Sequence, residues 1–140
     1  MKKALVAYHS KTGTTKRLAE EVGRFFENSS VATKIVSVDG FALADLEGVD
    51  FLLLGCWTSG VFVALQHPER PWVAFADRLP DVTGKKIGLF TTYTIVTGSM
   101  FRRMRTRLSC DPADIRLELK SRDGKLNESH RATLDRFLRA

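Results

Sequence analysis

Two short runs of this chain are apolar at every position, and they constrain its fold more than any other feature. They are Ala4–Tyr8 (ALVAY) and Phe51–Cys56 (FLLLGC). A strand with one wet face alternates apolar and polar side chains, whereas a strand covered on both faces is apolar throughout. We therefore expect both runs to be central strands of a parallel sheet with helices on both faces.

Segments of helical periodicity separate the predicted strands. In Lys16–Glu27 the apolar side chains recur at helical spacing, and charged side chains fill the other face. Further strands are predicted at 34–38, 86–91 and 115–120, and further helices at 42–47, 72–79, 98–108 and from 127 onward. A strand followed by a helix, five times over, predicts an α/β fold with a doubly wound, five-stranded parallel sheet. Because strands one, three and four are the most apolar, we expect the order 2-1-3-4-5. The 140 residues suit one domain over 1–140.

Ligands of such sheets bind beyond the carboxyl ends of the strands, where strand order reverses. The loops there are predicted to be Ser10–Thr15, Trp57–Phe62 and Thr91–Thr97. The first reads SKTGTT and joins a buried strand to a helix, an arrangement whose free N–H groups and helix dipole bind anions. Its glycine permits a tight turn, and its four hydroxyls can each donate to a phosphate oxygen. The alternative is that one threonine merely caps the helix.

The kind of phosphate follows from what the loop lacks. Neither G-x-x-x-x-G-K-[ST] nor G-x-G-x-x-G follows the first strand. Hydroxyls in place of glycines suggest a single terminal phosphate enclosed by one loop.

Here the chain resembles the flavodoxin family, whose phosphate loop has the pattern [ST]-x-T-G-x-T after the first strand. Ser10–Thr15 matches that pattern, and with the five β-α units the resemblance covers the whole chain. The uninterrupted fifth strand is similar to the short-chain form. The resemblance implies a flavodoxin-like fold that binds FMN, with the phosphate in the first loop and the isoalloxazine between the other two. The cofactor-binding residues that it implies are Ser10, Lys11, Thr12, Gly13, Thr14, Thr15, Trp57, Thr58, Ser59, Gly60, Phe62, Thr91, Thr92 and Tyr93.

An aromatic ring is expected to stack on the flavin, and Trp57, Phe62 and Tyr93 are the candidates. Trp57 departs from the family pattern, because it follows the predicted strand directly. It serves equally well as a packing residue. Trp72 is expected in the core, on the inner face of its helix.

The charge of the chain is unlike that of typical flavodoxins, which are acidic. Its net charge is +6, and no Asp or Glu occurs in residues 1–19, 51–68 or 82–110, which contain all three predicted loops. Such a site should favour the anionic, reduced flavin. Arg102, Arg103, Arg105 and Arg107 follow the third loop and could receive an acidic redox protein or the phosphates of NAD(P)H. Nucleic acid is disfavoured, since aromatic residues do not interleave with these arginines.

The leading interpretation is an FMN-binding electron-transfer protein, with no catalytic residue of its own and no metal site. One alternative is an FMN-dependent NAD(P)H or quinone-type oxidoreductase, and another is a flavin-free binding module with the same fold. No run of ~18 apolar residues could span a membrane, and the two cysteines show no metal spacing. We expect a cytoplasmic location.

Overall fold

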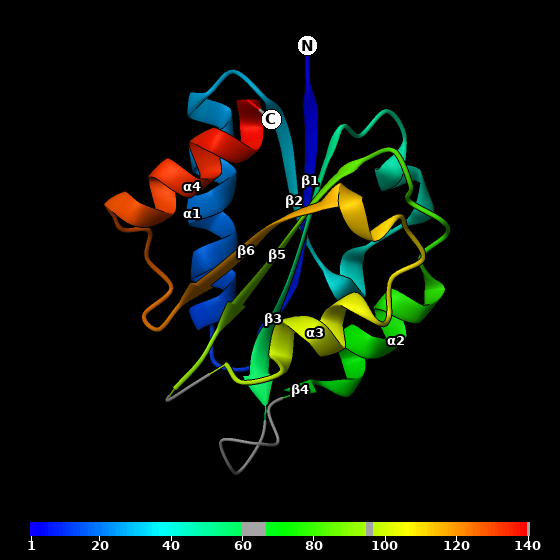
Figure 1. Cartoon of the computed structure of the whole chain (residues 1–140), viewed down its shortest axis with the longest axis vertical. Helices are drawn as coiled ribbons and strands as arrows, with labels where there is room; N and C mark the ends of the chain where they lie inside the picture. The colour runs from blue at the N-terminus through cyan, green and yellow to red at the C-terminus, as the bar shows by residue number, and fades with distance from the viewer. Residues whose placement is uncertain (60–66, 95–96, 140) are drawn as a thin grey trace.

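The computed structural model describes residues 1–59, 67–94 and 97–139, and it shows a twisted sheet between two layers of helices (Figure 1). The main path of the sheet runs β2-β1-β3-β5-β6, and every pair along it is parallel. The strands are β1 (Lys3–His9), β2 (Ala32–Ser37), β3 (Phe51–Ser59), β5 (Lys86–Thr92) and β6 (Ile115–Ser121). The predicted doubly wound sheet is confirmed. Its predicted order is confirmed too, once the two-residue strand β4 (His67–Pro68) is left out of the numbering.

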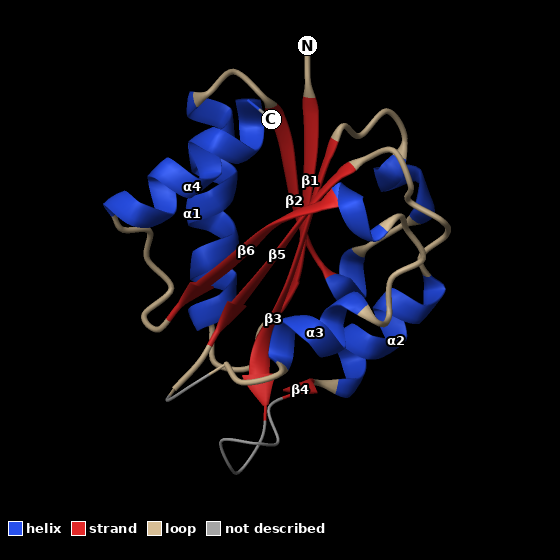
Figure 2. Ribbon diagram, in the orientation of Figure 1, coloured by secondary structure: helices blue, strands red, loops and turns tan. Residues whose placement is uncertain are grey.

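In the described part of the chain, the α-helices divide between the two faces of the sheet (Figure 2). α1 (Thr14–Asn28) and α4 (Glu128–Arg139) cover one face, and α2 (Arg70–Arg78) and α3 (Met100–Arg105) cover the other. Among the described residues, no helix is long and apolar enough to cross a membrane.

The all-apolar runs are explained by burial on both faces. In β1, Ala4 and Val6 pack into the cluster under α1 and α4, while Leu5 and Ala7 pack into the cluster under α2 and α3. All four side chains are fully buried. Full burial of an aliphatic side chain such as Leu5 contributes about 1.5–3 kcal/mol, so both helical layers depend on this strand.

The structure corrects three boundaries. β3 continues to Ser59, so Trp57–Ser59 is strand where a loop was predicted, because Trp57 pairs with Thr92 of β5 and Thr58 pairs with Pro68 of β4. The predicted helix at 42–47 is only a 3₁₀ turn, η2 (Leu43–Leu46), and other 3₁₀ turns occur at η1 (Val38–Gly40) and η4 (Pro112–Asp114). Crossovers this short accommodate a single tight turn.

The third correction concerns α3, which spans Met100–Arg105 instead of 98–108. Gly98 has φ +52°, in the left-handed region, so the helix begins after it.

Candidate functional site

Three predicted loops follow strands that are neighbours in the sheet. β1, β3 and β5 are adjacent and parallel, so His9, Ser59 and Thr92 end at one edge (Figure 1). The loops that follow these residues therefore begin at the same edge. Gly60 and Phe62, predicted from the sequence as part of the second loop, lie outside the described residues.

The loop between β1 and α1 has a left-handed turn at its centre. Gly13 has φ +93°, and its backbone N–H donates to the Ser10 hydroxyl oxygen at 2.9 Å. Lys11, Thr12 and Gly13 are exposed, and the Thr12 and Thr14 hydroxyl oxygens lie 3.4 Å apart. A Cβ built on Gly13 would meet nothing within 4 Å, so the space outside the turn is open.

This loop fits a phosphate group. The first hydrogen bond within α1 runs from the Arg17 N–H to the Gly13 carbonyl, so the helix itself does not use the N–H groups of Thr14, Thr15 and Lys16. Gly13 has no side chain with which to cap them. The positive end of the helix dipole therefore faces an exposed loop that carries Lys11 and no carboxylate.

A hollow of about 310 Å³ lies next to the loop, lined by Tyr8, His9, Ser10, Gly13, Lys16, Ser37, Val38 and Asp39. Asp39 brings a carboxylate to this side, from the turn after β2. The opposite side of the loop meets the turn after β6. A Cβ on Gly124 would lie 2.5 Å from the Thr14 carbonyl oxygen, and Arg17 Nη1 donates to the Asp123 carbonyl at 3.1 Å.

Buried threonine pairs connect the three predicted loops. The Thr15 and Thr92 hydroxyl oxygens are 2.6 Å apart, and so are those of Thr58 and Thr91. The Thr91 hydroxyl also lies 2.7 Å from the Cys56 carbonyl, which it can reach as a donor. All four side chains are buried. The sequence predicts that the Thr15 hydroxyl binds a phosphate, whereas in the structure it is hydrogen-bonded to Thr92. The less buried hydroxyls of the loop are those of Ser10, Thr12 and Thr14.

The candidate aromatic rings are accompanied by cations. Lys11 Nζ lies 4.8 Å from the centre of the Trp57 ring. Lys120 Nζ and the Arg122 guanidinium lie 6.0 Å and 5.5 Å from the centre of the Tyr93 ring. Both rings are half-buried, whereas Trp72 is fully buried in the core as predicted. Lys120 and Arg122 could not be predicted from the sequence, since only the fold brings β6 beside the residue that follows β5.

A carboxylate also reaches this edge. Glu69 Oε1 lies 3.1 Å from His9 Nε2, at the carboxyl end of β1. The acid-free segment of the sequence stops at Pro68, one residue earlier, so the sequence gave no sign of this contact. Beneath it, burial raises the pKa of the Cys56 thiol to about 12, which leaves a neutral thiol at physiological pH.

The structure divides the four arginines predicted as a partner site. Arg105 Nε binds the Glu118 carboxylate at 2.7 Å, and Arg107 lies 3.7 Å from the Asp77 carboxylate. Arg102 and Arg103 are exposed on α3, and Arg103 Nε donates to the Ser99 hydroxyl at 2.9 Å. Two of the four charges are therefore already balanced by carboxylates.

Comparisons with known proteins agree with this architecture. The family model for the flavodoxin domain matches residues 5–107. A flavodoxin of Maridesulfovibrio salexigens is 34% identical over 106 residues, which cover 71% of this chain and 72% of that protein. A flavodoxin of Clostridium beijerinckii is 26% identical over 104 residues and 74% of each chain. Among solved structures, a short-chain flavodoxin associated with a bacterial microcompartment superposes with a TM-score of 0.74 at 21% identity, covering 99% of this chain and 95% of the other.

Proposed function

The chain belongs to the flavodoxin family and is an FMN-binding electron-transfer protein, and we propose that its loop Ser10–Thr15 holds the FMN phosphate. When bound, FMN supplies the redox chemistry, because its isoalloxazine takes up and releases electrons. The residues of the chain bind and orient that group and set the charge around it. The left-handed turn at Gly13, which leaves the first turn of α1 open beside an acid-free loop, carries this proposal.

Each group of the loop has a distinct role. The N–H groups of Thr14, Thr15 and Lys16 donate to phosphate oxygens, and the hydroxyls of Ser10, Thr12 and Thr14 add donors around them. Lys11 adds positive charge at the loop. The Thr15 hydroxyl instead bonds the start of α1 to Thr92 of β5, which holds the first and third loops close together.

The isoalloxazine is proposed to lie between the second and third loops. Backbone groups of Ser59 and of Gly60, which is predicted from the sequence, would meet its polar edge together with those of the third loop from Tyr93 onward. Thr91 and Thr92 instead pair with β3 and β6 on both sides, and the Thr91 hydroxyl meets that of Thr58, so these threonines hold the strand ends beneath the flavin site together. Tyr93 and Trp57 are both half-buried at this edge, and Phe62 remains a candidate from the sequence.

The proposed redox partner is an acidic protein. Members of the family pass electrons to other proteins, and this chain carries a net charge of +6. Arg102 and Arg103, exposed on the helix that follows the third loop, add to the field that would attract such a partner. Arg105 and Arg107 contribute less, because each has a carboxylate beside it.

The test is FMN binding by the purified protein. Flavin absorption bands that stay with the protein through gel filtration, or quenching of added FMN fluorescence, are expected. A double substitution, Thr12→Val with Thr14→Val, should weaken FMN binding about a hundredfold or more, since each hydrogen bond to a charged group contributes about 1.5–3 kcal/mol. The control is Thr106→Val with Thr133→Val, one threonine directly after α3 and one within α4, whose hydroxyls donate to the Arg103 and Ser129 carbonyls.

Two results would count against the proposal. A colourless protein that ignores FMN would contradict the binding site. Equal loss of affinity in both double variants would contradict the role of the loop hydroxyls.

A separate test distinguishes a carrier from a reductase. Bleaching of the bound flavin by NADPH alone would favour a reductase, because a carrier needs a separate reductase.

A further inference from the structure

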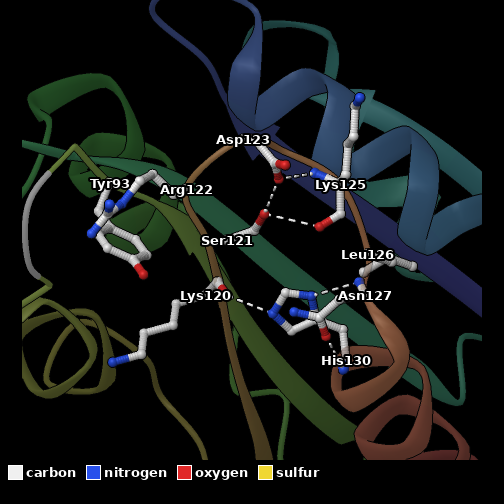
Figure 3. A pocket seen from close by; sticks show the side chains of 9 residues that line it. All are labelled: Tyr93, Lys120, Ser121, Arg122, Asp123, Lys125, Leu126, Asn127 and His130. Carbon is white, nitrogen blue, oxygen red and sulfur yellow. Dashed lines mark hydrogen bonds between the residues drawn. The ribbon is translucent and has the colours of Figure 1, made fainter.

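We propose that an acidic partner protein docks with its carboxylates over a basic pocket beside Tyr93, and that this pocket is the centre of the docking surface. The inference rests on the proposed function as an electron carrier. The pocket has a volume of about 550 Å³ (Figure 3). It is lined by Tyr93, Lys120, Ser121, Arg122, Asp123, Lys125, Leu126, Asn127 and His130.

The charged side chains of the pocket are mostly positive and exposed. Lys120, Arg122 and Lys125 are exposed, and within the part of the chain that the structure describes none of them forms an ion pair. Two of them stack on Tyr93 instead, at 6.0 Å and 5.5 Å from the ring centre. A cation held against an aromatic ring keeps its full charge and gains only about 0.5–1 kcal/mol at an exposed site. These charges therefore remain available to an anion.

Several of the remaining polar groups of the pocket are hydrogen-bonded to one another, as Figure 3 shows. The Ser121 hydroxyl donates to the Lys125 carbonyl at 2.9 Å, and the Lys125 N–H donates to the Asp123 carboxylate at 2.9 Å. His130 uses both ring nitrogens: Nδ1 accepts from the Asn127 N–H at 3.1 Å, and Nε2 donates to the Lys120 carbonyl at 2.8 Å. The Leu126 N–H faces the Glu21 carboxylate at 3.5 Å.

This occupancy decides what kind of anion the pocket fits. A phosphate cradle offers unused backbone N–H groups, as the first turn of α1 does. Here the N–H groups of Lys125, Leu126 and Asn127 are taken, and long flexible side chains carry the available charge. Such cations attract several carboxylates at once without fixing their positions, which suits the acidic surface of a protein better than one bound phosphate.

The position of the pocket supports the same assignment. Tyr93 lines the pocket, belongs to the third predicted flavin loop and is the first residue after β5. A partner that seats its carboxylates on Lys120 and Arg122 would therefore lie against the loop proposed to border the isoalloxazine. The four arginines from Arg102 to Arg107 lie in and just after α3, and two of them are already paired with Glu118 and Asp77.

The experiment measures binding of a fluorescein-labelled ten-residue glutamate peptide by anisotropy, with a glutamine peptide as its uncharged counterpart. Lys120→Gln with Arg122→Gln should weaken binding about fivefold, because each exposed charge pair contributes ~0.2–1 kcal/mol. Arg102→Gln with Arg103→Gln removes the same charge from α3 and should weaken binding less than about twofold. Binding should fall as salt rises, since the Debye length shrinks to about 8 Å at 0.15 M.

A charge-conserving double variant separates the effect of charge from that of side-chain shape. Lys120→Arg with Arg122→Lys keeps both charges and should bind the glutamate peptide as the unchanged protein does. All variants are checked for folding by circular dichroism. Equal losses in the two glutamine double variants would overturn the proposal, because net charge alone would then explain binding. Stoichiometric displacement of the peptide by NADP⁺ would also overturn it, in favour of a nucleotide site.

The measurement is made on the protein as purified and again after FMN is added. Peptide binding therefore tests the docking surface separately from the FMN site. If the protein binds the glutamate peptide but does not bind FMN, the result would count against the proposed function alone. FMN binding without a preference of the glutamate peptide for Lys120 and Arg122 would count against the docking surface alone.

Discussion

The two ends of the sheet treat their positive charges differently. At the amino end, Lys3 Nζ binds the Glu47 carbonyl at 2.8 Å, and Lys85 Nζ binds the Val49 carbonyl at 2.9 Å. At the carboxyl end, Lys11, Lys120 and Arg122 lie over the rings of Trp57 and Tyr93. Ammonium groups bonded to the chain's own carbonyls hold loops in place, whereas cations stacked on rings stay available to a ligand. The contrast has an exception on each side, since Lys86 at the amino end stacks on Phe51 and Arg17 at the carboxyl end binds the Asp123 carbonyl.

The free thiols give the largest expected contrast between the ends. Cys56, near the carboxyl end of β3, is fully buried, and desolvation raises its pKa to about 12. Cys110 precedes β6 and is half-buried, and its pKa is also raised, by desolvation and then by Asp114, Asp81 and Asp111. At pH 8 only about one Cys56 in ten thousand is a thiolate. In iodoacetamide labelling followed by mass spectrometry, we expect Cys110 to react and Cys56 to stay unmodified.

The same pKa predicts a loss of stability in alkali. The folded pKa of Cys56 lies above the unfolded value of 9.0, so its contribution is present below pH 9 and is lost as pH rises toward 12. Cys56→Ala should lessen the fall in unfolding free energy across this range. Rapid labelling of Cys56 in the native protein would contradict its burial, on which the labelling contrast and the alkaline loss of stability both depend.

A pair of glycines at opposite ends tests the phosphate loop. Gly13 and Gly84 have φ +93° and +95°, and a Cβ on either would meet nothing within 4 Å. Valine at either position should cost about 1–3 kcal/mol of stability, because a β-branched residue is strained in the left-handed region. Gly13→Val should also weaken FMN by about tenfold or more, whereas Gly84→Val should leave FMN affinity unchanged in fluorescence titrations. Equal FMN affinities in the two variants would show that the turn at Gly13 does not shape the site.

The buried bond between Thr15 and Thr92 is tested by its effect on stability alone. Thr15→Val or Thr92→Val alone leaves a buried hydroxyl without its partner and should cost about 1–3 kcal/mol in urea unfolding. The double variant should be nearly neutral relative to either single one. The control variant for stability is Thr33→Val at the amino end of the sheet. The Thr33 hydroxyl donates to the Val31 carbonyl at 2.9 Å, and this residue is only half-buried. Additive losses in the double variant would contradict a bond that joins the first and third loops.

The order of the strands and the phosphate loop could be predicted because both depend on local signals. Apolar runs such as Phe51–Cys56 report burial on two faces, and Gly13 among hydroxyls reports a tight turn before a helix. The extension of β3 through Trp57 could not be predicted, since its reason is pairing with Thr92 and Pro68, far along the chain. Long-range contacts also decided which hydroxyls are buried, which carboxylates balance Arg105 and Arg107, and which cations reach Tyr93. Sequence patterns thus indicate elements and turns, while side-chain partners across the sheet come only from the fold.

The smallest expected effect compares two cations that both stack on rings. Lys86 Nζ lies 5.6 Å from the centre of the Phe51 ring at the amino end, and Lys120 Nζ lies 6.0 Å from that of Tyr93 at the carboxyl end. If the bound flavin lies beside Tyr93, Lys120→Gln should make the second reduction potential more negative, because a positive charge favours the anionic, reduced flavin. The shift should stay below about 1 kcal/mol, the energy of two charges 4 Å apart in water, and should shrink further with salt. Lys86→Gln removes an equivalent charge from the far end of the sheet and should leave the potential unchanged in a potentiometric titration. Equal shifts in the two variants would mean that the flavin senses only net charge, and the contrast between the two ends would then have no bearing on redox tuning.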